Sequence, residues 1–465
     1  DDTARLVAAM LGDTPMVSDL ETLTDVFGGR PTGSSANLRA LEWAMGRFRD
    51  AGVDVRKEPF TMPGLWLERS GAATIQGAAS FSPRVAAMPF STATPRAGLT
   101  APLLDGRAGE AGDFQALGEK ARGAFVLIET PELVDVDGLF REYVEAAAIE
   151  ARAFAVGVAG LVYMGSRPND LLYRHNASLG LRNTHPMLVM ERDGAARALR
   201  LLRTGGSLTL TATIDIQSGP AYESYNVVGE IRGSSQPEEI VLIGAHLDSW
   251  DLGTGALDNG CNAMMVLDLA RQIKRLGIRP ARTIRFVLWN GEEQGLNGSW
   301  GYTRTHGPEL DRTVMASAYD IGSGRITGFY TGGRSEIIPT LERALDPVRG
   351  LGPFEQLNLP IVGTDNYDFM MQGVANLVAN QEAANYGPNY HARSDEFGRV
   401  DLTQLRLNGA IAGAVTLGFA NAEVGWGRQG AGAVQALVNS TDLEAQMRTF
   451  GVWDDWVKGI RGRKP

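Results

Sequence analysis

The stretch V-L-I-G-A-H-L-D-S-W-D-L-G-T-G-A-L-D-N-G, from Val241 to Gly260, decides the fold of this chain. Its first five residues form an apolar run without polar alternation, which is typical of a parallel strand buried on both faces. The imidazole of His246 and the carboxylate of Asp248 follow at the end of that run. The sequence therefore predicts a buried strand that delivers polar side chains to one edge of a sheet.

A second apolar run, T-I-R-F-V-L-W-N, predicts the next strand and is followed by Gly291, Glu292 and Glu293. Between the runs, residues 259–276 carry apolar side chains at helical spacing, and Gly277 follows as a C-cap. This pattern indicates a βαβ unit with a right-handed crossover. Open α/β sheets bind ligands at the carboxyl ends of their strands. We expect the segment after the second strand to be extended, so that Glu292 and Glu293 point to opposite sides.

These imidazole and carboxylate groups suit half of a two-metal hydrolytic site, since each zinc shell needs about four donors. Further ligands are therefore expected downstream. Among the 5 histidines, His391 in N-Y-H-A-R-S-D-E is the candidate second imidazole, and Asp320 in Y-D-I-G-S-G is a candidate carboxylate at another strand end. A lone H-x-D is usually a polar loop and paired glutamates are usually a solvated face, whereas the complete set in this order favours metal binding.

Four motifs resemble those of the co-catalytic dizinc exopeptidases, a family of aminopeptidases and glutamate carboxypeptidases, and they are most similar to its plasma glutamate carboxypeptidase-like subgroup. They read H-L-D-S-W-D-L-G-T-G-A-L-D-N-G, R-T-I-R-F-V-L-W-N-G-E-E-Q-G-L-N-G-S, Y-D-I-G-S-G and Y-H-A-R-S-D-E-F-G-R-V-D. With G-G-R-P-T-G-S-S-A-N-L-R-A near the N-terminus, the resemblance covers nearly the whole chain. It implies an α/β fold: a three-layer mixed-sheet catalytic domain with an inserted protease-associated cap.

The resemblance also implies two Zn²⁺ ions per chain and assigns five ligands to the four motifs. Asp258 would bridge both ions. His246 and Asp320 would complete one shell, and Glu293 and His391 the other. All five residues lie in the quoted motifs, in the family's order.

Three further residues take roles from the same resemblance. Glu292 would be the general base, and the Asp248 carboxylate would fix the tautomer and orientation of His246. Tyr390 resembles a tyrosine that stabilises the oxyanion in some relatives. Many subgroup members carry a doubled histidine where this chain has Tyr390 and His391, so an ordinary pocket-wall aromatic remains an alternative for Tyr390.

The expected activity is that of a zinc-dependent exopeptidase, which hydrolyses terminal bonds of short peptides or dipeptides through a metal-bound hydroxide. Metal binding lowers the pKa of water from 15.7 towards about 7, and Glu292 would accept the proton. An alternative is a carboxypeptidase-like amidohydrolase acting on N-acyl amino acids or related amides. A non-catalytic, receptor-like binding protein on the same scaffold is an alternative of another class, but it would require lost ligands.

Composition limits the partners and the location. The 465 residues, 44% of them hydrophobic, can build about two to three domains. A net charge of −10 argues against nucleic acid or an anionic membrane as partner. Cys261 is the single cysteine, so the chain cannot form an internal disulfide, and this residue is expected in the core. The apolar stretch from Ile411 to Ala422 is too short to span a bilayer. The start at Asp-Asp-Thr fits a removed signal segment and a periplasmic or secreted protein.

Changes in composition and sequence pattern along the chain predict four parts. They are 1–62, the N-terminal part of the catalytic domain; 63–219, the protease-associated-like cap insert; 220–422, the dizinc catalytic domain; and 423–465, a C-terminal helical segment with a basic tail. The catalytic sheet should resume at Tyr225 to Ile231 as an edge strand. His175 and His185 fall in the insert, whose expected role is to close a blind pocket. The tail is expected to be an oligomer arm, as in a homodimer, or disordered.

Overall fold

The computed structural model describes residues 1–464, which separate into two compact units. Unit 1 comprises Asp1–Met62, Glu223–Tyr386 and the chain from Asp395 onward, and unit 2 comprises Pro63–Tyr222 and Gly387–Ser394. Each unit contains a seven-stranded sheet of its own. Among the described residues, no helix combines the length and the hydropathy that crossing a bilayer requires.

The sheet of unit 1 has a parallel centre and antiparallel flanks. In spatial order the strands are β1 (Asp54–Met62), β9 (Tyr222–Ile231), β11 (Arg282–Trp289), β10 (Gln236–His246), β12 (Thr313–Ala318), β14 (Asn376–Gln381) and β13 (Ile326–Tyr330). β10 pairs in parallel with β11 and β12, and β12 pairs in parallel with β14. β9 runs antiparallel to β11, and β13 runs antiparallel to β14. The predicted buried strands are thus β10 and β11, adjacent and parallel.

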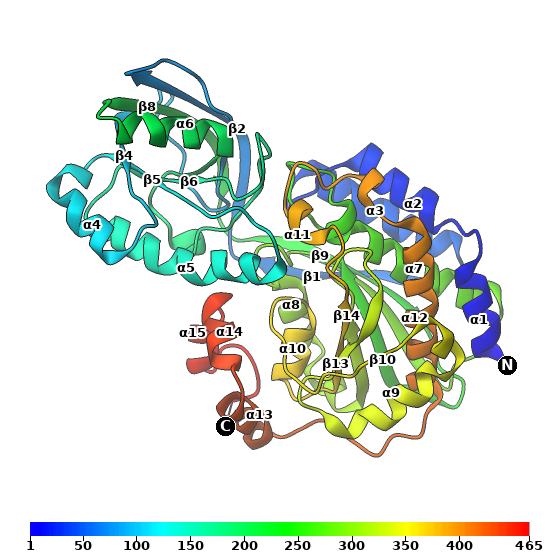
Figure 1. Cartoon of the computed structure of the whole chain (residues 1–465). Coiled ribbons are helices and arrows are strands. Elements are labelled where there is room, and N and C mark those ends of the chain that lie inside the picture. Colours follow the sequence, from blue (N-terminus) through cyan, green and yellow to red (C-terminus); the bar gives the residue numbers. More distant parts are fainter. Residues whose placement is uncertain (465) are drawn as a thin grey trace. The chain divides into compact units, whose positions relative to one another are not determined.

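Helices cover both faces of this sheet, which makes unit 1 a three-layer α/β structure (Figure 1). One face carries α7 (Cys261–Arg275) and α12 (Leu402–Asn421), with α1 (Asp2–Leu11) and α2 (Met16–Thr22) packed against them. The other carries α8 (Asn297–Thr305) and α10 (Asn366–Met371). The remaining longer helices of this unit's main body are α3 (Ser35–Asp50) and α9 (Ile338–Leu345). The fold class predicted from the sequence is confirmed for this unit.

The βαβ unit forms as predicted. α7 starts at the fully buried Cys261, and Gly277 follows its end with a φ of 64°, a left-handed conformation that glycine adopts without steric cost. The parallel register pairs His246 with Trp289. The residues that follow both strands therefore emerge at the same edge of the sheet.

The expectation that the sheet of unit 1 resumes with an edge strand was wrong. β9 is not an edge strand, because β1 lies outside it in the sheet. Its alternating burial holds only near its start, and Val227 and Val228 are both fully buried, as in an interior strand.

The C-terminal stretch holds three helices, where the sequence predicted one: α13 (Ala431–Ser440), α14 (Leu443–Thr449) and α15 (Trp453–Val457). Their apolar side chains pack with those of Tyr367 and Met370 in one core cluster. Arg461, in the basic tail, is 3% exposed and pairs with Asp368 at 2.7 Å. The tail is thus an ordered part of unit 1 as far as residue 464, and whether it also serves a homodimer stays a prediction.

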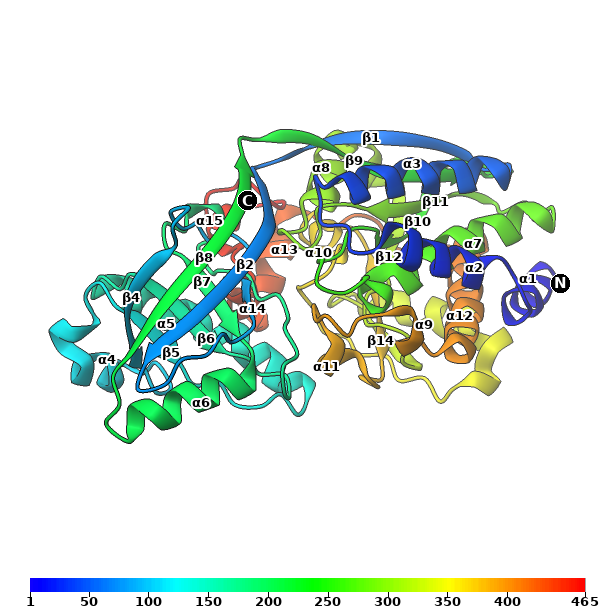
Figure 2. The same cartoon turned by 90° about the horizontal axis from the view of Figure 1, so that it is seen from above.

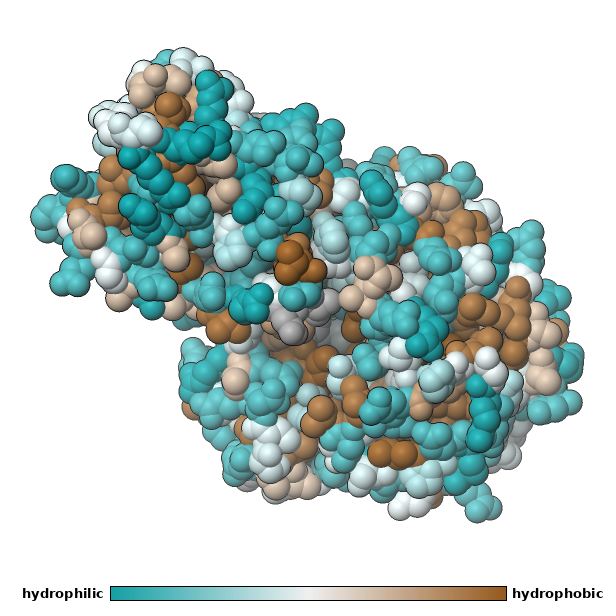
Figure 3. All heavy atoms as spheres, in the orientation of Figure 1, coloured by the Kyte–Doolittle hydropathy of each residue, from teal (hydrophilic) through white to brown (hydrophobic). Residues whose placement is uncertain are grey.

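Unit 2 is built on a second mixed sheet, in which β2 and β8 form a long antiparallel ribbon (Figure 2). Its helices are α4 (Ala111–Leu117), α5 (Val136–Ala155) and α6 (Arg192–Arg203). The strand order is β2 (Leu65–Gly77), β8 (Leu208–Gly219), β4 (Leu99–Asp105), β5 (Phe125–Ile128), β6 (Gly160–Met164), β7 (Met187–Met190) and β3 (Val85–Ala87). On the visible face of each unit, hydrophilic side chains surround scattered hydrophobic ones (Figure 3).

Glu150 on α5 is a carboxyl group buried in the core of unit 2, with 1% of its surface exposed. Its oxygens accept hydrogen bonds from the backbone N–H of Ser178 at 2.9 Å and from the Ser178 hydroxyl at 3.1 Å. Burial outweighs these bonds and raises the pKa of Glu150 to about 7, from 4.5. The folded protein therefore holds a proton that the unfolded chain releases.

This carboxyl group should make stability fall with rising pH. Between pH 4.5 and about 7, unfolded Glu150 is ionised while folded Glu150 stays protonated, so the folded state binds more protons. The free energy of unfolding of the wild type, relative to Glu150→Gln, should decrease by about 2–3 kcal/mol across this window. Urea unfolding at several pH values measures it, with Glu145→Gln, an exposed site on the same helix, as control. A difference that does not change with pH would contradict the expectation.

Candidate metal centre

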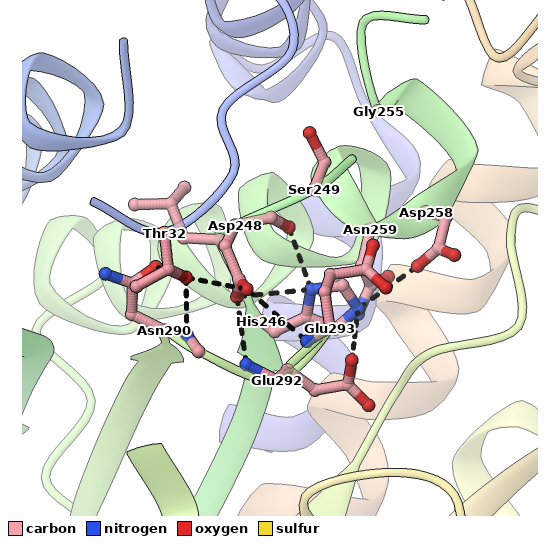
Figure 4. A network of polar contacts seen from close by, with 12 residues as sticks. Thr32, His246, Asp248, Ser249, Gly255, Asp258, Asn259, Asn290, Glu292 and Glu293 are labelled. Atoms are coloured by element: carbon pink, nitrogen blue, oxygen red, sulfur yellow. Dashed lines mark hydrogen bonds and ion pairs between the residues drawn. The ribbon is translucent and has the colours of Figure 1, made fainter. Parts of the chain in front are cut away.

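The carboxyl ends of three parallel strands and one buried turn bring the candidate ligands of unit 1 together, and Figure 4 shows His246, Asp258 and Glu293 among them. His246 is the last residue of β10, and Asp320 follows β12 after one intervening residue. Glu292 and Glu293 follow β11. Asp258 comes from the buried turn Ala256–Gly260 that precedes α7.

His246, Asp258 and Asp320 form a compact group of buried donors. His246 Nε2 lies 3.1 Å from Asp258 Oδ1 and 2.9 Å from Asp320 Oδ1. One ligand atom from each residue lies within 4.8 Å of the others, and the three residues are at most 7% exposed. Imidazole nitrogen with carboxylate oxygen is a donor set that zinc accepts. The residues present therefore fit a metal ion.

The electrostatics of this group also favour a cation. Burial raises the pKa of the Glu292 carboxyl well above its usual value, and it raises the pKa of Asp320 as well. For His246, burial lowers the pKa, but the carboxylates of Asp320 and Glu292 outweigh burial and raise it. Several buried acids around one imidazole leave excess negative charge, which a bound cation offsets.

Asp248 contacts His246 and also the two glutamates that follow β11. The orienting contact to His246 Nδ1 comes from the backbone carbonyl of Asp248 at 2.9 Å, whereas its carboxylate Oδ1 lies 3.6 Å from that nitrogen. The carboxylate instead accepts the backbone N–H groups of Glu292 at 3.3 Å and Glu293 at 3.4 Å, and the Thr32 hydroxyl at 2.9 Å. Asp248 therefore positions the two glutamates through their backbone.

The extended conformation predicted for the glutamate pair was wrong. The backbone N–H groups of Gly295 and Leu296 both donate to the carbonyl of Glu292 at 2.9 Å, so a turn begins there. Gly291 precedes it with a φ of 70°, where an added Cβ would lie 2.7 Å from Met62 Sδ. The turn lets consecutive N–H groups converge on one carboxylate.

The N-terminal motif G-G-R-P-T supplies support that the sequence did not reveal. Thr32 Oγ1 accepts the N–H of Gly291 at 2.9 Å. Asn290 and Asn37 exchange amide hydrogen bonds at 2.8 and 3.0 Å. Arg30 is fully buried and donates to the carbonyl of Leu247 at 2.6 Å and to those of Thr254 and Gly255. Burial lowers the pKa of Arg30 to about 10.

Asp395 is a second supporting group that sequence reasoning missed. Its carboxylate accepts the N–H of Leu257 at 2.6 Å and that of Asp258 at 3.1 Å. Burial raises the pKa of Asp395 to about 7. The quoted motif Y-H-A-R-S-D-E contains this aspartate, but its partners are backbone groups, which leave no mark in a sequence pattern.

Tyr390 and His391 lie in the segment Gly387–Ser394, which groups with unit 2. The hydroxyls of Tyr390 and Tyr143 lie 3.0 Å apart, and the carbonyl of His391 accepts the N–H of Arg174 at 2.9 Å. The rings of Tyr390 and His391 stack at 3.7 Å. The structure thus positions these two side chains from unit 2, whereas Asp258 and Glu293 belong to unit 1.

Three arginines near the motifs could recognise a substrate carboxylate; Arg393 is exposed, and the other two have protein partners. Arg325 pairs with Glu382 at 2.9 Å. Arg334 is buried and pairs with Glu336, and it also donates to the carbonyls of Gly373 and Gly427. These contacts indicate structural roles.

Comparison with known proteins supports this fold. Residues 226–416 match the model of Peptidase family M28. Carboxypeptidase Q from Bos taurus is 26% identical over 418 residues, which cover 87% of this chain and 85% of the relative. Aminopeptidase YwaD from Bacillus subtilis is 24% identical over 413 residues, 85% of this chain and 82% of the relative.

Solved structures agree. A peptidase M28 precursor from Shewanella amazonensis superimposes with a TM-score of 0.82 at 26% identity, covering 91% of this chain and 96% of that protein. BSAP, a zinc aminopeptidase from Bacillus subtilis, has a TM-score of 0.68 at 23% identity, covering 86% and 93%, which shows the shared fold. The match to Peptidase family M28 over residues 226–416 spans every candidate metal ligand, and the relatives that match most of the chain are peptidases.

Proposed function

We propose that this enzyme is a dizinc exopeptidase that hydrolyses terminal bonds of short peptides, with unblocked dipeptides as preferred substrates. The observation that carries the proposal is the buried group of His246, Asp258 and Asp320, with a Glu292 carboxylate oxygen 3.8 Å from His246 Nε2. One zinc ion fits this group. Zinc bound there supplies a Lewis acid that makes a water molecule acidic enough to attack at neutral pH.

For the second ion we propose Asp258, Glu293 and His391, residues that together could hold a metal. Asp258 would then serve both ions, as a bridging carboxylate. Support comes from the chemistry of the set, because His391 supplies the second imidazole and Glu293 is 7% exposed. The backbone contacts of Asp258 with Asp395 and of Glu293 with Asp248 preorganise both carboxylates.

Glu292 is proposed as the group that moves the proton. It belongs to neither of the two ligand groups found among the described residues, yet its carboxylate faces the same imidazole. Its raised pKa, caused first by burial, suits a carboxyl that accepts a proton and returns it to the leaving amine. Its backbone N–H is fixed by Asp248, which limits where the carboxylate can lie.

The preference for a free amino terminus follows from the charges near the site. Buried acids can hold a substrate ammonium, whereas a carboxypeptidase-type site needs an arginine or lysine for the carboxylate. Arg325 and Arg334 are already paired. An amidohydrolase that acts on N-acyl amino acids is the competing activity, and a receptor-like protein without catalysis is disfavoured because all the predicted ligands are present in the chain.

Four features remain predictions within this proposal. Residues 63–219 would form a protease-associated-like cap over a blind pocket, and Tyr390 would stabilise the oxyanion. The protein would be secreted or periplasmic, and it would form a homodimer.

The purified enzyme should contain about two zinc ions per chain and lose activity on chelation. His391→Ala should lower the content to about one, because it removes an entire donor from one shell. Metal analysis after dialysis measures the content, with His185→Ala, in unit 2, as a control that keeps both ions. Active wild-type protein with one ion or none would contradict a dinuclear site.

Glu292→Gln should abolish turnover while retaining metal and fold, since the amide has the size of the carboxylate but cannot accept the proton. A loss in kcat of about 10²–10⁴-fold or more is expected. Steady-state kinetics together with metal analysis measure it. If more than about a tenth of the wild-type kcat remained, another residue would have to be the base.

N-acetylation of a good dipeptide substrate should lower kcat/KM by roughly 10–150-fold, because it removes charge-assisted hydrogen bonds worth about 1.5–3 kcal/mol. Hydrolysis of the free dipeptide, its N-acetyl form and its C-terminal amide should be compared. Faster cleavage of the acetylated form, with loss of activity on amidation, would identify a carboxypeptidase or N-acyl amidohydrolase instead. Cleavage of internal bonds in casein would contradict the blind pocket.

A further inference from the structure

The turn that begins at Glu292 has a second support, which comes from the C-terminal tail of the chain. Arg461 donates from Nη1 to the carbonyl of Gly295 at 3.1 Å and from Nη2 to the carbonyl of Leu296 at 3.2 Å. The N–H groups of the same two residues donate to the carbonyl of Glu292 at 2.9 Å. The guanidinium group of Arg461 therefore contacts the two residues that hold the backbone of Glu292.

This turn needs support because two consecutive residues in it have positive φ angles, 114° at Gly295 and 59° at Leu296. Glycine adopts such angles without steric cost, but a left-handed leucine persists only where its surroundings hold it. The Leu296 side chain is 5% exposed and lies in one core cluster with Met447 of α14 and Trp456 of α15. The C-terminal helices thus supply an apolar restraint on the turn, and Arg461 supplies a polar one.

The guanidinium group of Arg461 is itself fixed in the interior of unit 1. The residue is 3% exposed, and it donates from Nε to Asp368 Oδ1 at 2.8 Å and from Nη2 to Asp368 Oδ2 at 2.7 Å. Its central carbon lies 4.9 Å from the ring centroid of Trp300 and 5.2 Å from that of Tyr367. Asp368 also accepts the Ser299 hydroxyl at 3.0 Å. A bidentate pair with a buried carboxylate orients the planar guanidinium group, so its other N–H groups have set directions.

Asp248 and Arg461 act on the same short segment at its two ends. Asp248 accepts the N–H groups of Glu292 and Glu293, and Arg461 binds the two carbonyls at the end of the turn. We propose that Arg461 is a positioning residue for the reaction, which places the Glu292 carboxylate by holding the turn that follows it. This inference rests on the proposed role of Glu292 as the base. A displacement of a reacting group by about 1 Å can cost about 10²-fold in rate.

Arg461→Lys tests this role, because an ammonium group can still pair with Asp368 but lacks the planar fork that reaches both carbonyls. The substitution should lower kcat for an unblocked dipeptide at least about tenfold, while KM and zinc content stay at the wild-type values. Arg463→Lys is the matched control. Arg463 lies in the same tail but donates to the carbonyl of Gln429, so its substitution should leave kcat unchanged.

A second variant covers the case in which Arg461→Lys does not fold. Arg461→Met combined with Asp368→Leu removes both charges and leaves no buried carboxylate unpaired, and it should show the same loss of kcat. Hydrogen exchange with mass spectrometry adds a readout that needs no activity. In both variants the peptide containing Gly295 and Leu296 should exchange faster than in wild type and in Arg463→Lys.

A double-mutant cycle separates positioning from a general loss of structure. In a Glu292→Gln background, Arg461→Lys should change the residual kcat by no more than about twofold, because the group that it places is already absent. An equal loss in both backgrounds, a change in KM or zinc content that accompanies the loss, or unchanged exchange of the turn would overturn the proposal. Glu292→Gln alone tests the base, so a failure of the proposed function is seen separately from a failure of this inference.

Discussion

The repulsion among buried carboxylates at the carboxyl edge of the parallel strands is the constraint on which the rest of unit 1 depends. Asp258, Asp320 and Glu292 all lie close to His246, in a place that water hardly reaches. Such a group is stable only with protonation or with a cation, and the nitrogen and oxygen donors fit zinc. A sheet with a parallel centre meets this constraint, because neighbouring strand ends bring distant residues together at one edge.

Backbone hydrogen bonds, more than side-chain pairs, fix the geometry of these acids. Asp395 accepts the N–H of Asp258, and Asp248 accepts the N–H groups of Glu292 and Glu293. Each supporting carboxylate thus positions a functional residue without competing for its oxygens. The supporting carboxylates leave the oxygen atoms of the candidate ligands available for a metal. Charge-assisted hydrogen bonds from backbone N–H groups stabilise these supporting carboxylates in the interior.

The sequence predicted best the positions of functional residues that directly follow a strong local pattern. His246 and Asp320 follow short apolar runs, so their place at strand ends could be inferred from periodicity. The turn after Gly291 could not, because it depends on Asp248, 44 residues away, accepting the N–H of Glu292. The interior position of β9 was missed for a similar reason, since its outer neighbour β1 comes from a distant part of the chain.

The two proposed metal shells differ in what holds them. His246, Asp258 and Asp320 take their positions from strand ends and a turn of unit 1 alone. His391 takes its position from unit 2, through the backbone contacts of its segment with Tyr173 and Arg174. In a dinuclear site the second ion would therefore depend on the order of unit 2, whereas the first would not.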